Sequence, residues 1–232
     1  MTTIGFIGSG NIGSTVARLA VDADYDVVLS NSRGPETLQD LVGDLGPHAT
    51  AGTPEQAAAA DLVVVTVPLS VIEQVPAGPL HGKVVIDTCN YYPQRDGHVA
   101  ELDDETTTTS ELVQRHLAGA KVVKGFNNIN YLHLRDLARP SGSPERTSLP
   151  IAGDDADAKS QVATFFDAIG YDAYDVGPLA EGWRFQRDTP AYASLYNGDT
   201  TGTWPPPPGS ARQVTAEVLR ERLAEAKRYR DM

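Results

Sequence analysis

The stretch that decides the fold is TIGFIGSGNIG, residues 3–13, which carries glycines at Gly8, Gly10 and Gly13. The apolar run before the glycines is typical of a short buried strand. Apolar residues then recur at helical spacing, at Ile12, Val16, Leu19 and Ala20. In such a turn the first glycine allows a sharp bend, the second lets the backbone approach a pyrophosphate and the third permits close helix–strand packing. The stretch therefore predicts a dinucleotide site, with the positive end of the helix facing the phosphates.

The end of the next predicted strand, residues 26–30, distinguishes the two nicotinamide dinucleotides. Sites selective for NAD usually place Asp or Glu there, to bind the ribose hydroxyls. This chain has Asn31, Ser32 and Arg33 instead, with the Ser30 hydroxyl beside them. The Arg33 guanidinium is a planar cation whose N–H groups can bind two phosphate oxygens at once, so the sequence favours NADP(H). The alternative is an ordinary turn, since Asn-Ser-Arg-Gly-Pro is also common turn chemistry.

Strand and helix patterns alternate along the rest of residues 1–180. Further strand-like runs cover residues 62–67, 83–87, 121–126, 148–152 and 173–176. Helix starts are marked by the capping box Thr53-Pro54-Glu55-Gln56, by Ser110, and by Asp154 and Asp155. Runs of Val and Ile between helices indicate a parallel sheet covered on both faces. We therefore expect an α/β fold, a Rossmann-type doubly wound parallel sheet with a small C-terminal helical cap.

The segment after Val176 has a different character. It is too short for a separate catalytic domain. Val214, Val218 and Leu223 suggest one amphipathic helix, and residues 204–208 (WPPPP) a stiff surface connector. We expect residues 1–180 to form the NADP-binding Rossmann domain. Residues 181–232 would then be a C-terminal extension that caps the same domain.

Composition narrows the function classes. The chain has 232 residues, 41% of them hydrophobic, and a formal net charge of −12, which argues against nucleic acid and anionic membranes as partners. No signal peptide or membrane-spanning run is evident, and the one cysteine, Cys89, excludes an internal disulfide, so we expect a cytoplasmic protein. The five histidines show no metal-ligand spacing, and no metal site is expected. The sequence leaves the oligomeric state open, a homo-oligomer included.

Ligands of a doubly wound sheet lie beyond the carboxyl ends of its strands. The residues expected near the pyrophosphate or the nicotinamide ribose are Thr66, Val67, Pro68 and Leu69. Residues 87–90 and 126–129 should surround the nicotinamide. Asn127 is a candidate partner for the ribose or the carboxamide, and Ile129 a spacer against the ring; a strand-end turn and ordinary core packing are the alternatives. Cys89 also falls here, either as an inert small hydrophobe or as a reactive thiol.

No acid–base pair, nucleophile elbow or P-loop accompanies this site, so no catalytic residue is assigned. Hydride transfer between two planar rings needs the donor and acceptor carbons held about 3–3.5 Å apart, without a proton-transferring side chain. The cofactor carries such chemistry, and the protein supplies binding, orientation and exclusion of water. A one-domain chain fits this reaction.

The order of motifs resembles one known family, the NADPH-dependent reductases of the 8-hydroxy-5-deazaflavin coenzyme F420. The motifs that carry the resemblance are residues 8–13 (GSGNIG), Ser32-Arg33, Thr66-Val67-Pro68, residues 122–129 (VVKGFNNI), Gly153-Asp154-Asp155 and Gly177-Pro178-Leu179. The similarity covers about residues 1–180 and continues through residues 180–184. It implies a Rossmann domain with a small helical cap, in which the deazaflavin stacks on the nicotinamide.

By matching position, the resemblance places Ser9, Gly10, Asn11 and Ile12 at the pyrophosphate, Ser32 and Arg33 at the 2′-phosphate, and Ile129 at the nicotinamide face. Archaeal members have histidine where this chain has Asn127, and an aromatic residue at Leu69. The asparagine version also resembles the oxidoreductase domain of membrane metalloreductases, which pass electrons to a flavin.

Three functions stay open on the sequence. The first is hydride transfer between NADP(H) and a deazaflavin of the F420 type. The second is NADPH-dependent reduction of another acceptor, such as a flavin, an imine or another small compound with a C=N or C=C bond. The third is an NADPH-binding module without catalysis. The expected partners in the first two are small-molecule substrates.

Overall fold

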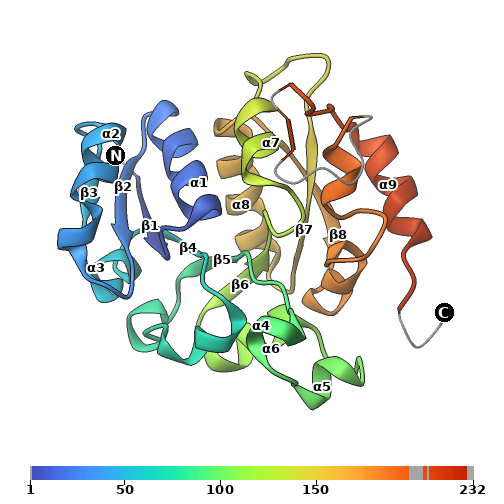
Figure 1. Cartoon of the computed structure of the whole chain (residues 1–232), viewed down its shortest axis with the longest axis horizontal. Coiled ribbons are helices and arrows are strands. Elements are labelled where there is room, and N and C mark those ends of the chain that lie inside the picture. The colour runs from blue at the N-terminus through green and yellow to red at the C-terminus, as the bar shows by residue number, and fades with distance from the viewer. Residues whose placement is uncertain (1, 199–205, 208, 229–232) are drawn as a thin grey trace.

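The computed structural model describes residues 2–198, 206–207 and 209–228. Its framework is one eight-stranded sheet in the order β3-β2-β1-β4-β5-β6-β7-β8 (Figure 1). The strands are β1 (Thr3–Ile7), β2 (Asp26–Ser30), β3 (Ala49–Ala51), β4 (Leu62–Val65), β5 (Val84–Asp87), β6 (Lys121–Lys124), β7 (Ser148–Gly153) and β8 (Asp172–Gly177). The strand order reverses between β1 and β4, and ligands of doubly wound sheets bind beyond the strand ends at such a point.

Helices cover both faces of the sheet. The core on one face takes side chains from α1 (Asn11–Asp22), α2 (Gln39–Leu45), α7 (Tyr131–Asp136), α8 (Ala156–Ala168) and α9 (Ala216–Glu225). The core on the other takes them from α3 (Pro54–Ala58), α6 (Thr109–His116) and the 3₁₀ helices η2 (Leu69–Gln74) and η3 (Gly78–Leu80). Shorter helices are α4 (Pro93–Asp96), α5 (Ala100–Asp103), η1 (Pro35–Leu38), η4 (Leu179–Phe185) and η5 (Ala193–Tyr196).

Two-sided burial explains why the strands are almost continuously apolar. In β4, Val64 faces the first core while Val63 and Val65 face the second, and all three are fully buried. Strands of this kind have no solvent face and so no polar alternation. The α/β doubly wound fold predicted from the sequence is confirmed in this part of the sheet.

The turn from β1 into α1 depends on space as much as on backbone freedom. Gly8 has a φ of +107°, and a Cβ there would lie 2.5 Å from the carbonyl oxygen of Thr66. At Gly13 a Cβ would lie 2.3 Å from the carbonyl oxygen of Gly8. Backbone cannot move aside cheaply, so both positions require glycine, as the sequence motif predicts.

The prediction of a wholly parallel sheet is wrong at one strand. β7 runs antiparallel to β6, paired at Val123 with Gly153 and at Lys124 with Ala152. A parallel strand would need a crossover that returns the chain to the amino ends of the strands. The only α-helix in the intervening segment is α7, whose six residues span about 9 Å. The chain therefore enters β7 at the end of the sheet where it left β6, and β8 then pairs parallel to β7.

Local details also differ from the sequence-based expectation. The short edge strand β3 was not predicted, because three residues give too little pattern. The helix predicted to start at Ser110 is capped by Thr108, whose hydroxyl accepts from the Glu111 N–H, since that pair completes a capping box. Asp155 caps α8, whereas the Asp154 carboxylate accepts from the backbone N–H of Leu179.

The C-terminal extension shares the core of the sheet. Its side chains in the first core are Phe185, Ala191, Leu195, Tyr196, Val214, Leu219 and Leu223. The division at residue 180 stays a prediction, as does the connector at 204–208, of which only Pro206 and Pro207 are among the described residues. Within the described ranges, no helix combines the length and the apolar character needed to cross a bilayer.

Candidate functional site

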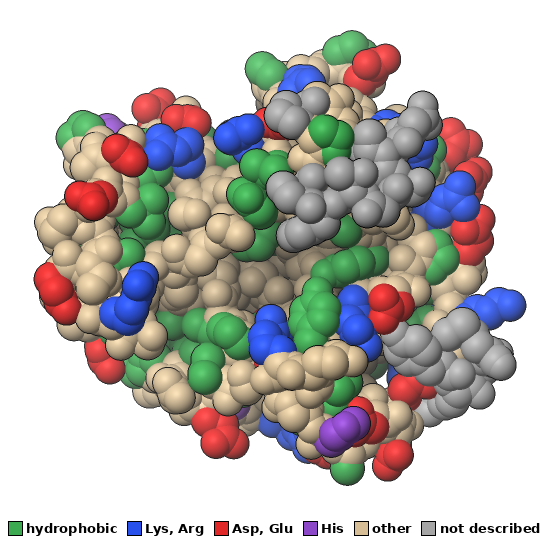
Figure 2. All heavy atoms as spheres, viewed as in Figure 1, with side chains coloured by type: hydrophobic (Ala, Val, Ile, Leu, Met, Phe, Trp, Pro, Cys, Tyr) green, Lys and Arg blue, Asp and Glu red, His purple; other side chains and the backbone are tan. Residues whose placement is uncertain are grey.

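Two adjoining cavities lie at the carboxyl edge of the sheet. Cavity A, about 460 Å³, reaches from the β1–α1 turn to the end of β2. Cavity B, about 530 Å³, reaches from the same turn to the loops after β5 and β6. Both are lined by Gly10, Thr66, Val67 and Pro68, so together they form one continuous site. Figure 2 shows the face hollowed at its centre, where the elements around cavity B meet in Figure 1.

The N-terminus of α1 is prepared for an anion. Gly10 is its N-cap residue, no side chain caps the helix and its first turn holds no acidic residue. A Cβ built at Gly10 would meet no atom within 4 Å, because the space beside it belongs to the two cavities. Free N–H groups beside open space fit a pyrophosphate. Of the residues predicted at the pyrophosphate, Ser9 lines cavity A, Asn11 and Ile12 line cavity B, and Gly10 lines both. Gly8, predicted for the turn, also lines cavity A.

The loop after β2 brings Asn31, Ser32 and Arg33 into the wall of cavity A. The Arg33 backbone N–H donates to Asn31 Oδ1 at 2.9 Å, and Asn31 Nδ2 donates to Thr37 Oγ1 at 2.9 Å, which fixes the turn. Ser32 and Arg33 are exposed, and within the described ranges the Arg33 guanidinium has no ion pair. Both can therefore receive a phosphate. Ser30 cannot, because it is fully buried and donates its hydroxyl to the Phe6 carbonyl.

The loop after β4 separates the two cavities. The Thr66 hydroxyl donates to the Gly8 carbonyl at 2.7 Å and so ties this loop to the glycine turn. Val67 and Pro68 follow it in the lining of both cavities. Leu69 lines neither, because its side chain packs into the second core with an exposure of 5%.

Cavity B has aromatic and amide walls and little charge. Tyr92, Tyr131 and Tyr192 line it, together with Asn127 and the other residues Thr88, Cys89, Asn90, Arg95, Phe126, Ile129, Asn130 and Ala193. Among the described residues, its lining contains no carboxylate and no histidine, and Arg95 is the one charged side chain. This composition offers ring contacts and hydrogen bonds but no obvious acid–base pair.

Hydrogen bonds fix the orientation of the Asn127 side chain. Its Nδ2 donates to Asn90 Oδ1 at 3.2 Å and to the Phe185 carbonyl at 3.0 Å, while Asn90 Nδ2 donates to the Asn127 carbonyl at 2.7 Å. Asn127 Oδ1 is buried and has no hydrogen-bond partner among the described residues. A buried acceptor without a donor is costly. Asn127 Oδ1 is thus available as an acceptor, and its contact with a carboxamide or ribose stays a prediction.

Several residues of cavity B were not predicted from the sequence. The phenol oxygens of Tyr92 and Tyr192 lie 2.7 Å apart, which joins the loop after β5 to the C-terminal extension. Burial, and then the hydrogen bond to Tyr92, raise the pKa of Tyr192 well above its ordinary value, so it stays protonated. The two tyrosines are 100 positions apart in the sequence, and no local pattern marks Tyr192.

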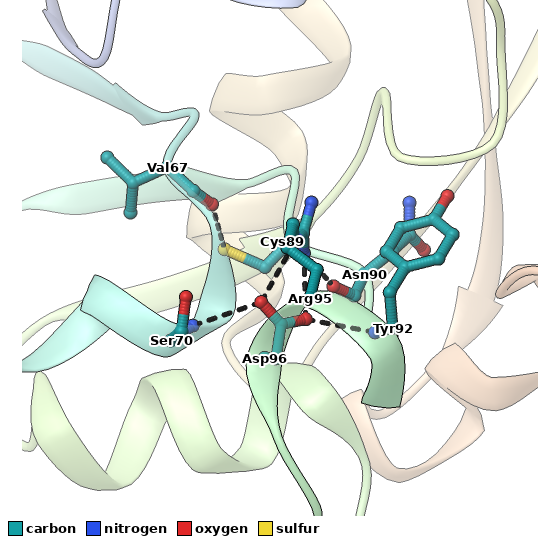
Figure 3. Close-up of polar contacts among 7 residues, drawn as sticks. All are labelled: Val67, Ser70, Cys89, Asn90, Tyr92, Arg95 and Asp96. Atoms are coloured by element: carbon teal, nitrogen blue, oxygen red, sulfur yellow. Dashed lines mark hydrogen bonds and ion pairs between the residues drawn. The ribbon is translucent and has the colours of Figure 1, made fainter.

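Arg95 is positioned by the short helix α4. Its guanidinium donates to the Asn90 carbonyl at 2.9 Å and to both oxygens of Asp96, and it lies 4.8 Å from the centre of the Tyr92 ring. Figure 3 shows Asp96 between these groups and the backbone N–H of Ser70, to which it is also hydrogen-bonded. The Asp96 carboxylate thus connects the loop after β5 to η2.

Replacing Asp96 by Asn is expected to destabilise the protein by about 1–3 kcal/mol, since a nearly buried carboxylate with four donors loses its charge. Burial alone would raise the pKa of Asp96, but hydrogen bonds from Arg95 and from the Tyr92 N–H outweigh it and lower the pKa below its ordinary 3.8. Because the pKa of Asp96 is lower in the folded state, its ionised form stabilises the fold fully above pH 3.8. This stabilisation is lost as the pH falls through the lowered pKa. Melting temperatures of both proteins against pH should converge only at that acid end. A constant gap down to the lowest pH would refute this role.

Cys89 fits the inert interpretation. Its thiol is buried, with Sγ 3.2 Å from the Val67 carbonyl oxygen (Figure 3). Burial, assisted by the nearby Asp87 carboxylate, raises the pKa of the thiol well above its ordinary value. Thiolate is the reactive form of cysteine, so this side chain acts as a small hydrophobic part of the wall.

Comparisons with known proteins bear on the family of this chain. The family model described as "NADP oxidoreductase coenzyme F420-dependent" matches residues 3–91, which contain the whole lining of cavity A. The structure of the hypothetical protein SMa0349 from Sinorhizobium meliloti is 30% identical, with a TM-score of 0.72, over 83% of this chain and 94% of that one. None of the curated proteins compared with the chain matches it.

Two further structures bear on family and fold. A protein from Arthrobacter sp. FB24, provisionally assigned as an F420-dependent NADP reductase, is 27% identical with a TM-score of 0.66, over 78% of this chain and 87% of that one. A pyrroline-5-carboxylate reductase from Coxiella burnetii is 20% identical with a TM-score of 0.57, over 84% and 67%, and shares the fold. The dinucleotide-binding turn, the cavity beyond it and these similarities lead to one assignment. The chain is an NADP-dependent oxidoreductase, and its residues 3–91 match the family of coenzyme-F420-dependent NADP oxidoreductases.

Proposed function

We propose that this oxidoreductase transfers hydride between NADP(H) and a deazaflavin of the F420 type. The observation that carries the proposal is the character of cavity B, where the described part of the chain supplies tyrosine and amide walls beside the helix N-terminus but no carboxylate or histidine. A planar acceptor that takes hydride from another ring needs such walls and no proton relay within the site. The family assignment supports the same acceptor.

In this proposal the protein acts by placing the two rings. The N-terminus of α1 holds the pyrophosphate, and Ser32 and Arg33 hold the 2′-phosphate. Asn127 and Ile129 set the nicotinamide in cavity B, which leaves the tyrosine wall for the acceptor. The reduced nicotinamide, when bound, supplies the hydride. Tyr92 and Tyr192 line this space and help to exclude water from it.

A direct test mixes the enzyme with NADPH and an oxidised deazaflavin, and follows the visible absorbance of the deazaflavin. We expect this absorbance to fall at the rate at which NADPH is oxidised, because each hydride that leaves one ring enters the other. FMN and a cyclic imine, each supplied without deazaflavin, serve as competing acceptors. Turnover with either of these and none with deazaflavin would replace the proposal by a reductase of that acceptor class.

Tight NADPH binding without turnover of any acceptor would instead indicate a non-catalytic module. The proposal includes a cytoplasmic location and small-molecule substrates, supported by the single cysteine and by the acidic net charge of −12.

A further inference from the structure

A buried pair of opposite charges lies behind cavity B, among residues that the proposed reaction does not use. Asp87, the last residue of β5, is fully buried, and Lys124, the last residue of β6, has an exposure of 2%. Ser110 of α6, also fully buried, stands between them. Its hydroxyl donates to Asp87 Oδ2 at 2.6 Å and accepts from Lys124 Nζ at 3.1 Å.

The same charges hold both ends of one residue. The Cys89 backbone N–H donates to Asp87 Oδ1 at 2.8 Å, and the Cys89 carbonyl accepts from Lys124 Nζ at 3.0 Å. Asp87, Ser110, Lys124 and the Cys89 backbone therefore form a closed ring of hydrogen bonds, which we call the Cys89 clamp. Three separate elements, β5, α6 and β6, meet in it.

The clamp acts directly on the wall of cavity B. Cys89 lies between Thr88 and Asn90, and all three residues line the cavity. Asn90 connects this wall to the loop after β6, because its side chain exchanges hydrogen bonds with Asn127 on that loop. Both loops that surround the expected nicotinamide position are thus fixed through one buried network.

The Cys89 clamp buries two charged groups, which costs free energy. Burial lowers the pKa of Lys124, and the nearby Asp87 carboxylate opposes this effect. Burying both charges costs free energy that apolar side chains of similar volume would not require. Close packing leaves little room for change, since a Cβ at Gly182 would lie 2.9 Å from Lys124 Cδ. Because burying these charges is not an efficient way to stabilise a fold, their burial favours a role in fixing the position of residues 88–90.

We infer that Asp87, Ser110 and Lys124 are positioning residues, which hold residues 88–90 in the form that receives the nicotinamide ring. The inference rests on the proposed placement of the nicotinamide in cavity B and does not depend on which acceptor takes the hydride. A clamp of this kind sets the distance between donor and acceptor carbons, and a misplacement of about 1 Å can lower turnover about 100-fold.

The test compares Lys124→Met, which keeps the apolar stem, with Lys124→Met/Asp87→Asn, which also removes the unpaired carboxylate. Calorimetry measures the affinity of each for NADP+ and for 2′-phospho-ADP-ribose, which lacks the nicotinamide. We expect Lys124→Met to bind NADP+ about 10-fold more weakly and 2′-phospho-ADP-ribose unchanged, with kcat about 10- to 100-fold lower. The double variant should regain melting temperature but neither NADP+ affinity nor kcat.

Arg146→Met is the matched control, because Arg146 is also a buried cation, bonded to Asp167, Asp172 and the Tyr171 carbonyl, and lines neither cavity. It should lower the melting temperature and leave both affinities and kcat unchanged. Ser110→Ala removes the bridge with both charges in place, so it gives the same pattern if Lys124→Met does not fold. Equal changes for both ligands, no change for either, or recovery of NADP+ affinity in the double variant would overturn the inference. The binding results stand whether or not a deazaflavin is reduced, which separates this inference from the proposed function.

Discussion

Gly10→Leu is expected to remove NADPH binding while the fold remains intact. No atom lies within 4 Å of a Cβ at this position, and the φ of −72° suits any residue, so the side chain is accommodated in the empty protein. It would then occupy the space beside the N-terminus of α1 that the pyrophosphate needs. Loss of two charge-assisted hydrogen bonds of about 1.5–3 kcal/mol each weakens binding about 100-fold or more. Calorimetry and thermal unfolding measure the two effects separately.

Two other glycines provide controls for this experiment. Gly43→Leu, in α2, also places its side chain in open space but far from both cavities, and should leave NADPH affinity unchanged. Gly13→Ala should lower the melting temperature, because its Cβ would lie 2.3 Å from the Gly8 carbonyl oxygen. If Gly10→Leu still binds NADPH at wild-type affinity, the pyrophosphate does not lie at the helix N-terminus.

Arg33→Ala is expected to lower NADPH affinity about 10- to 100-fold and to leave NADH affinity almost unchanged. The Arg33 guanidinium is exposed in the wall of cavity A and has no ion pair among the described residues, so its charge is available to a 2′-phosphate. A charge-assisted contact of this kind is worth about 1.5–3 kcal/mol. The wild type should also lose NADPH affinity with added salt more steeply than the variant does.

Affinities for both dinucleotides, measured by calorimetry at two salt concentrations, check this prediction. Arg220→Ala is the control, since Arg220 is an exposed arginine of α9 that lines neither cavity. Equal losses for NADPH and NADH in Arg33→Ala would show that the side chain supports the loop and does not contact the phosphate.

Local interactions explain what the sequence could predict. The β1–α1 turn is built within residues 3–13, and its glycines are required by contacts inside that stretch and with Thr66. The loop at Asn31–Arg33 follows directly from where β2 ends. The capping box at Thr53 and Gln56 forms as predicted, because its two hydrogen bonds join residues three positions apart. Such features place cavity A from sequence alone.

Cavity B depends on contacts between distant segments, and much of it could not be predicted. Its tyrosine wall pairs Tyr92 with Tyr192 of the C-terminal extension. The Cys89 clamp joins β5, α6 and β6 through side chains that no sequence motif links to one another. The antiparallel β7 likewise follows from the short helix α7 in the connection before it, a feature that the predicted strand and helix patterns do not include. The half of the site that sets the acceptor is thus the half that needs the structure.

The most direct measurement of the central claim is a crystal structure of the protein with NADP+ bound. We expect the 2′-phosphate at Ser32 and Arg33, the pyrophosphate at Gly10–Ile12, and the nicotinamide in cavity B against Ile129. Space for a second planar ring should remain beside Tyr92 and Tyr192. A nicotinamide outside cavity B, or one that fills it and leaves no room for an acceptor ring, would contradict hydride transfer at this site.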